Sequence, residues 1–201
     1  DGGQFVAPHD TNVIDEVLKI KSLEDIKMSG NEDNIEIIGE DIDKIYLDRV
    51  EKNCLLPDVI RRHKDIKIVY TPLHGTGVTL VPAILQRLGF TNVTMVKEQA
   101  INDGNFPTVK SPNPEEKSAL EMAIALAKDI DADIVMATDP DADRVGIAVK
   151  RKDGQWMLLN GNQTASVLTY YLVNQWKLNN KLIGKEFIVK TLKSMEFGIE
   201  E

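Results

Sequence analysis

Three features of the sequence predict an α/β protein with a three-layer α/β/α core, a mainly parallel sheet and partial neighbouring domains at both ends. A strand pattern, a glycine-rich turn, an amphipathic run and a second strand pattern follow one another between residues 66 and 97. This order is typical of a βαβ unit, in which a crossover helix joins parallel strands. Further strand patterns follow at 134–137 and 145–149. The composition, 42% hydrophobic and 28% charged residues, is that of an ordinary globular protein.

Two helical patterns precede the predicted sheet. Apolar residues recur at roughly helical spacing from Asp10 to Met28, which predicts a connecting helix that ends at the turn Ser29-Gly30-Asn31. A second helix is expected from Asp41 to His63. Pro57 should interrupt it, because proline removes a backbone donor and crowds the preceding turn.

Turn residues bound the βαβ unit on both sides of its helix. Its strands are expected at 66–70 and 92–97. Between them, the turn 71–77 leads into a helix at 78–88, and Gly89 provides the stop signal because glycine readily adopts the left-handed backbone of a helix end.

The second half of the core begins with a loop. The stretch 100–114 is rich in Pro, Gly and Asn, which are typical of turns. A helix should follow, because Asn113 can cap it, Pro114 suits the first helical position and Glu116 lies where a capping box needs it. After the two later strands, Asp153-Gly154 predicts a hairpin turn.

The patterns divide the chain into three regions. Residues 1–40 are expected to be the tail of a preceding domain with a linker helix, and 41–160 the central α/β domain. Residues 161–201 read as the truncated start of a following domain. That last region contains a helical pattern at 163–176 and a strand-like segment, Phe187-Ile188-Val189.

Composition excludes several classes of partner. The net charge of -8 argues against a nucleic-acid surface, which normally shows as clustered basic residues. No apolar run approaches the roughly 20 residues of a membrane helix, and the first ten residues lack the pattern of a signal peptide. With Cys54 as the single cysteine no internal disulfide can form, so we expect a cytoplasmic protein without membrane contacts.

The segment Asp139-Pro140-Asp141-Ala142-Asp143-Arg144 carries the clearest chemical signal. Three carboxylates at alternating positions after a strand can converge on one hard cation, and Mg²⁺ fits oxygen ligands that leave room for phosphate or water. The pattern of an EF-hand is not matched, since Arg144 would replace its glycine and Lys150 its bidentate glutamate, which argues against a calcium sensor. A solvated acidic turn remains an alternative. So does a phosphatase of haloacid-dehalogenase type, with Asp139 or Asp141 as the nucleophile.

A glycine-rich turn, His74-Gly75-Thr76-Gly77, lies between the first strand and its helix. Glycines let backbone N–H groups approach an anion at a helix N-terminus, so His74, Gly75 and Gly77 are candidate phosphate-binding residues. Tight packing is the alternative for the glycines. A structural histidine held by backbone groups is the alternative for His74.

Together these motifs resemble the α-D-phosphohexomutases, the family of phosphoglucomutase and phosphomannomutase. The resemblance rests on segments that occur in the family's order: 70–77, 106–108, 111–115, 139–144 and 188–191. It implies an enzyme that moves a phosphoryl group between O1 and O6 of a hexose, through a phosphoserine and a hexose 1,6-bisphosphate intermediate. The form Thr-Pro-Leu-His-Gly-Thr-Gly at 71–77 favours glucose over mannose as the substrate.

The resemblance also implies residue roles. Asp139, Asp141 and Asp143 would hold Mg²⁺ beside the phosphoserine, where the ion would neutralise charge during phosphoryl transfer. Arg144 would face phosphate. Lys190 matches a lysine near the reacting sugar hydroxyl, with an ordinary surface lysine as the alternative.

Three other family motifs do not occur in these 201 residues. They are the serine loop Thr-Ala-Ser-His-Asn-Pro, the sugar loop Gly-Glu-Glu-Ser-Gly and an arginine-rich phosphate loop. Ser166 follows Thr164-Ala165 but precedes Val167 within a helical pattern, so it is not a candidate nucleophile. We therefore expect a fragment that is inactive by itself and whose partners are a phosphosugar and the remaining domains of its parent. A non-catalytic metal-binding module is the third hypothesis, beside the mutase and the phosphatase.

Overall fold

The computed structural model describes residues 3–189, which form two units: one up to Glu40, the other from Asp41 onward. The first unit contains α1 (His9–Val17) and two single 3-10 turns, η1 (Leu23–Asp25) and η2 (Glu32–Asn34). The expected helix to Met28 is therefore too long. The carboxylate of Asp25 accepts the backbone N–H groups of Lys21 and Ser22, at 2.8 and 3.1 Å, which removes both donors from a helical ladder.

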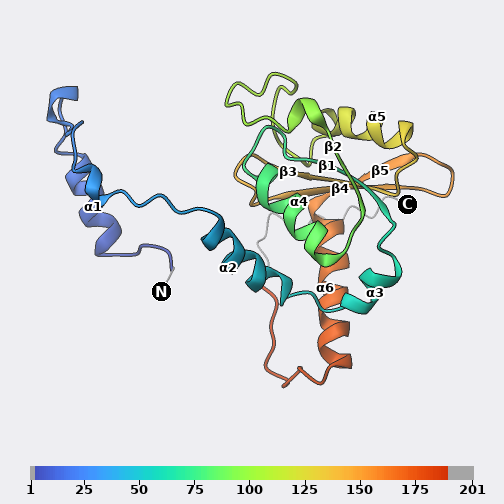
Figure 1. Ribbon diagram of the computed structural model, residues 1–201. Helices are drawn as coiled ribbons and strands as arrows, with labels where there is room; N and C mark the ends of the chain where they lie inside the picture. The colour runs from blue at the N-terminus through green and yellow to red at the C-terminus, as the bar shows by residue number, and fades with distance from the viewer. Residues whose placement is uncertain (1–2, 190–201) are drawn as a thin grey trace. The chain divides into compact units, whose positions relative to one another are not determined.

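The second unit is built on a five-stranded sheet in the order β2-β1-β3-β4-β5 (Figure 1). β1 pairs in parallel with β2 and β3, whereas β4 pairs antiparallel with both β3 and β5. Four of the five strands thus run in one direction, as expected for a mainly parallel sheet. The strand bounds are β1 Lys67–Thr71, β2 Asn92–Met95, β3 Ile134–Thr138, β4 Val145–Lys150 and β5 Trp156–Leu159.

Helices cover both faces of this sheet, which confirms the three-layer α/β/α class. Figure 1 shows α5 on one side and α4 and α6 on the other. The helix bounds are α2 Glu40–Glu51, α3 Pro57–Arg62, α4 Gly77–Leu88, α5 Glu121–Asp129 and α6 Gly161–Leu178, with short turns η3 Lys97–Gln99 and η4 Lys117–Leu120. Among residues 3–189, no helix combines the length and apolar character needed to cross a membrane.

The main core lies between the sheet and α5. Alternate strand residues Val69, Val135 and Ala148 are fully buried there, as the period-2 geometry of strands requires. α5 and the turn before it contribute small and large apolar side chains to the same cluster. They are Ala119, Leu120, Ala123 and Ala127. Burying a leucine such as Leu120 contributes about 2 kcal/mol, so this layer fixes the strands that carry the site.

Several predicted boundaries shift. The helix expected over 41–63 is split by residues 52–56, so the interruption expected near Pro57 is confirmed, and Pro57 itself opens α3. The helix expected from Pro114 begins only at η4. Asn113 accepts the N–H of Glu115 through its side chain and that of Glu116 through its carbonyl, which forms a turn rather than a helix start.

The predicted hairpin turn is confirmed, whereas one predicted strand does not form. β5 pairs with β4 across the predicted Asp153-Gly154 turn, where Gly154 takes the positive φ of 81° that favours glycine. Phe187, Ile188 and Val189 form no strand and are exposed. A strand needs a neighbour for its backbone hydrogen bonds, and no described strand pairs with this segment.

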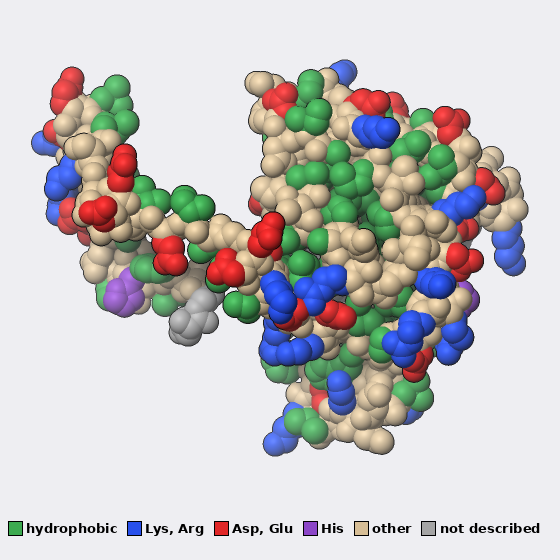
Figure 2. All heavy atoms as spheres, in the orientation of Figure 1, with side chains coloured by type: hydrophobic (Ala, Val, Ile, Leu, Met, Phe, Trp, Pro, Cys, Tyr) green, Lys and Arg blue, Asp and Glu red, His purple; other side chains and the backbone are tan. Residues whose placement is uncertain are grey.

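An ion-pair cluster joins α2 to α4. Arg87 on α4 donates to Glu51 at 2.9 Å and also bonds to Asp48, which in turn accepts Lys44 at 3.3 Å. Figure 2 shows acidic and basic side chains next to one another over this part of the molecule. The pKa of Asp48 is lowered, chiefly by its hydrogen bond to Arg87. α2 is thereby attached to the layer that covers the second face of the sheet.

Candidate metal centre

The acidic loop and the glycine-rich turn meet at one edge of the sheet. The turn follows β1 and the loop follows β3, which are adjacent parallel strands with Thr71 opposite Ala137. Carboxyl ends of parallel neighbours lie together, and such edges commonly hold the site of α/β proteins. The loop 139–144 returns directly into the antiparallel strand β4, so Thr138 and Val145 pair across its base.

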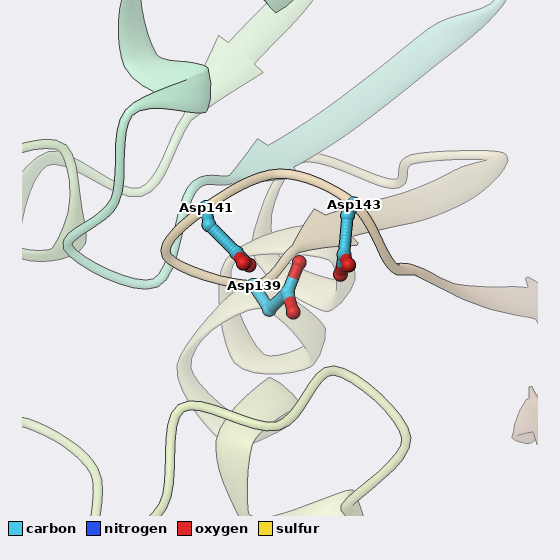
Figure 3. A group of neighbouring side chains, drawn as sticks. All are labelled: Asp139, Asp141 and Asp143. Carbon is cyan, nitrogen blue, oxygen red and sulfur yellow. The ribbon is translucent and has the colours of Figure 1, made fainter. Parts of the chain in front are cut away.

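The three aspartates of this loop converge. Figure 3 shows Asp139 at the end of β3, with Asp141 and Asp143 reaching toward it from the loop. One carboxylate oxygen from each lies within 4.8 Å of the others. Ligands of an octahedral Mg²⁺ lie about 2.9–4.2 Å apart, so a small movement of the two exposed side chains suffices. Geometry and donor type therefore fit a hard divalent cation.

Asp139 is the buried member of the three, and Arg144 holds it. Its side chain is 1% exposed, and Arg144 donates to it twice, from the backbone N–H at 2.9 Å and from Nε at 2.6 Å. Burial by itself would raise the pKa of Asp139, but the hydrogen bonds and charge of Arg144 outweigh it and keep the pKa below the ordinary value. Asp139 is therefore an ionised ligand candidate with a fixed orientation.

Asp143 experiences the opposite effect. The pKa of its carboxyl is raised, first by repulsion from the charge of Asp141 and then by partial desolvation and by Asp139, and Arg144 offsets this only in part. Carboxylates that raise one another's pKa repel in the absence of a cation. A bound cation would relieve this repulsion.

His74 lies in a buried polar network rather than in an open anion site. Its Nδ1 lies 3.0 Å from the carbonyl oxygen of Ile101, so it donates, and Nε2 lies 2.8 Å from Oγ1 of Thr108. Thr108 also accepts the side-chain N–H of Gln99 at 3.0 Å, and Gln99 accepts the hydroxyl of Thr71 at 2.7 Å. Both ring nitrogens thus have protein partners, which favours the structural alternative for His74.

Gly75 and Gly77 allow close packing. A Cβ at Gly75 would overlap the backbone of Pro140, and one at Gly77 would overlap the hydroxyls of Tyr70 and Thr138. The backbone N–H of Gly75 donates to Pro72 and that of Thr76 to Pro140. These contacts favour the packing alternative, and phosphate binding by this turn stays a prediction.

The remaining candidates differ in what the structure shows of them. Ser166 lies inside α6 and its hydroxyl donates to the carbonyl of Asn162 at 2.8 Å, as expected for a helical serine. Lys190 lies outside the described residues. Each oxygen of Asp139 accepts one bond from Arg144 and keeps a lone pair for a further partner. Sequence reasoning missed Gln99 and Thr76, whose partners only the fold reveals.

Fold and site together define an α/β/α domain that presents a carboxylate loop at the carboxyl edge of its sheet. Comparison with known protein families identifies the family to which this domain belongs. Residues 44–154 match the model of the phosphoglucomutase/phosphomannomutase family, alpha/beta/alpha domain II. The chain belongs to the phosphoglucomutase/phosphomannomutase family, and its described core corresponds to the second domain.

Individual relatives agree with this assignment. The chain is 33% identical, over its full length, to a protein of Haemophilus influenzae named as a probable phosphomannomutase, and covers 41% of that protein. It is 40% identical, over 67% of its length, to a phosphoglucomutase of Staphylococcus haemolyticus, and covers 24% of that enzyme. The chain thus spans less than half of the curated relatives it matches.

A solved structure shows the same fold. A phosphoglucomutase/phosphomannomutase family protein from Burkholderia thailandensis superposes with a TM-score of 0.51 at 24% identity. The match covers 67% of this chain and 26% of the other. The α/β/α layering is therefore shared with a family member at low sequence identity.

Proposed function

We propose that this chain is the metal-loop region of a phosphohexomutase that interconverts hexose 1-phosphate and hexose 6-phosphate, with glucose preferred over mannose. The observation that carries the proposal is the convergence of Asp139, Asp141 and Asp143 beside Arg144, in a member of this family. The parent would work through a phosphoserine and a hexose 1,6-bisphosphate intermediate. By itself, this 201-residue chain should be inactive, because it lacks a serine loop of the family type.

We assign different roles to the residues of the loop and its surroundings. The three aspartates would hold Mg²⁺, which when bound supplies positive charge beside the phosphoryl group. Arg144 orients Asp139 through Nε, and its side chain is 54% exposed, so other guanidinium N–H groups can face a phosphate. His74 and Gln99 hold the adjoining turn in place. Lys190 is proposed to act near the sugar hydroxyl.

The test uses the natural full-length parent. Conversion of glucose 1-phosphate, with Mg²⁺ and catalytic glucose 1,6-bisphosphate, is measured for the natural enzyme and for Asp141→Asn. Loss of a ligand carboxylate should lower kcat/KM by at least about 100-fold, the upper range for residues that only support a ligand. The matched control is Asp129→Asn, an exposed aspartate at the end of α5, which should keep full activity.

The contrary results are equally specific. Release of inorganic phosphate without isomerisation would replace the mutase with the phosphatase. Full activity in Asp141→Asn would remove this loop from the mechanism. Mannose 1-phosphate and ribose 1-phosphate, run in parallel, rank the sugars by kcat/KM and decide the preference for glucose.

A further inference from the structure

Thr76 occupies the N-cap position of α4 but does not cap it. A threonine there ordinarily accepts a backbone N–H from the first turn of its own helix. The side chain of Thr76 makes no such bond. Its hydroxyl donates instead to the carbonyl oxygen of Pro140 at 3.1 Å, and its backbone N–H donates to the same oxygen at 2.8 Å. A side chain suited to stabilising the helix is thus bonded to the acidic loop.

The bonded carbonyl lies at a sensitive point of that loop. The oxygen of Pro140 belongs to the peptide unit that joins Pro140 to Asp141, so its direction sets the plane from which the Asp141 side chain departs. Two donors occupy both lone pairs of this oxygen. Gly75 packs directly against the Pro140 backbone, without room for a Cβ. Proline fixes its own φ as well, so little freedom remains ahead of Asp141.

The turn that carries Thr76 is itself held firmly. His74 donates its backbone N–H to Gln99 at 2.9 Å, and its ring bonds to the loop 101–108. The side chain of Gln99 is fully buried and bonds to Thr71 and Thr108. Within the described chain, no buried side-chain nitrogen or oxygen lacks a partner. Fully satisfied buried networks of this kind are rigid.

We infer that Thr76 is a positioning residue for the acidic loop, holding the Pro140 carbonyl so that the Asp141 carboxylate is directed toward Asp139 and Asp143. The loop aspartates then need little rearrangement to receive a cation. The part of the inference that concerns metal affinity rests on the proposed function. The part that concerns loop order does not.

The experiment compares Thr76→Val and Thr76→Ser in the 201-residue chain. Valine keeps the shape and the backbone N–H but removes the hydroxyl. In Thr76→Val, hydrogen exchange at the amides of Ala142 and Arg144, which bond to Asp139 at 3.0 and 2.9 Å, should accelerate by about tenfold. The Kd for Mg²⁺, measured by calorimetry, should rise by about tenfold. Thr76→Ser should restore both values.

Two comparisons separate positioning from general stability. The thermal midpoint of Thr76→Val without metal should fall by only about 2–4 °C, because the variant loses one exposed hydrogen bond and its side chain does not cap α4. Thr79→Val, at an exposed position of the same helix, should change none of the measured quantities. Unchanged exchange and Kd in Thr76→Val, or a uniform rise in exchange across the chain, would overturn the inference. If the natural chain fails to bind Mg²⁺, the metal assignment fails, while the exchange data still decide the role of Thr76.

Discussion

Asp139 and Arg144 form a charged pair of unequal exposure. The carboxylate is 1% exposed, while the arginine side chain remains about half in water. Because the pKa of Asp139 stays low in spite of burial, Arg144 keeps this candidate ligand ionised, whereas burial by itself would favour its protonation. At the scale of the residue, the same pair therefore affects both the stability of the fold and the ionisation of the Asp139 carboxylate.

Replacing Arg144 should therefore destabilise the chain even in the absence of metal. Arg144→Gln removes the Nε donor and leaves a buried carboxylate short of a partner, which costs about 1–2 kcal/mol after allowance for nearby water. Urea unfolding at pH 7 measures this loss in the free energy of unfolding. Arg151→Gln is the matched control, because the carboxylate of its partner Asp153 lies 3.7 Å away and both side chains are exposed. Equal midpoints for the two variants would contradict the account.

The sequence predicted the convergence of candidate site residues correctly where the residues involved are close together in the chain. The alternation of Asp139, Asp141 and Asp143 is visible in the sequence, and the structure brings their oxygens together. Thr76 and Gln99 carry no comparable signal. Their partners lie 64 and 28 residues away, at Pro140 and Thr71. Only the pairing of β1 with β3 brings Thr76 to Pro140, and only the pairing of β1 with β2 brings Gln99 to Thr71.

At the scale of the element, the close approach of the turn after β1 to the acidic loop predicts a sharp difference between two glycines. Gly75→Ala should destabilise the chain by about 2–3 kcal/mol, since its Cβ meets the backbone of Pro140, which cannot move as a flexible side chain can. It should also weaken Mg²⁺ binding. Gly104→Ala, where nothing lies within 4 Å of the added Cβ, should stay within about 0.5 kcal/mol.

Thermal unfolding and Mg²⁺ calorimetry of the two alanine variants provide the measurement. Near-natural stability and affinity for Gly75→Ala would contradict the prediction, because the turn could then move away from Pro140 to make room for the Cβ. Loss of stability in both variants would point to backbone strain on adding a Cβ rather than to the contact with Pro140.

Elements were predictable where one signal dominated. The strand pattern before the glycine-rich turn and the stop at Gly89, which adopts a φ of 104°, were correct because local backbone chemistry decides them. The helix expected after residue 113 forms as η4 and α5, but its start at Pro114 was wrong, and the carbonyl of Pro114 packs where a Cβ on Gly146 of β4 would lie. That contact is tertiary, and a capping pattern cannot report it.

At the scale of the whole molecule, the two units differ in what they bury. Every described residue from 3 to 39 is exposed, whereas the second unit contains the buried cluster around α5. A chain beginning at Ile38 should therefore unfold within about 2 °C of the full chain. A chain ending at Asn160 lacks α6 with its buried Thr164, and should unfold at clearly lower temperature. Calorimetry of both chains checks this, and a large loss on removing residues 1–37 would contradict it.

Whole-molecule features followed from the sequence only in part. The α/β class and the family are confirmed, because strand, turn and helix signals occur in a consistent order. The proposed division at residues 40 and 160 stays a prediction. The antiparallel pairing of β5 with β4 follows from the Asp153-Gly154 turn. The pairing of β4 with β3 depends on which edge of the sheet accepts a strand, and local patterns contain no information about edges.

The return of the acidic loop into β4 affects how an ion would enter and leave. Because Thr138 pairs with Val145 at the base of the loop, the backbone on both sides of the aspartates is already ordered. Capture of a cation by the loop would then cost little conformational entropy and would need no folding step. The exchange rate would be set by how fast the ion sheds its water shell, which Mg²⁺ does reluctantly.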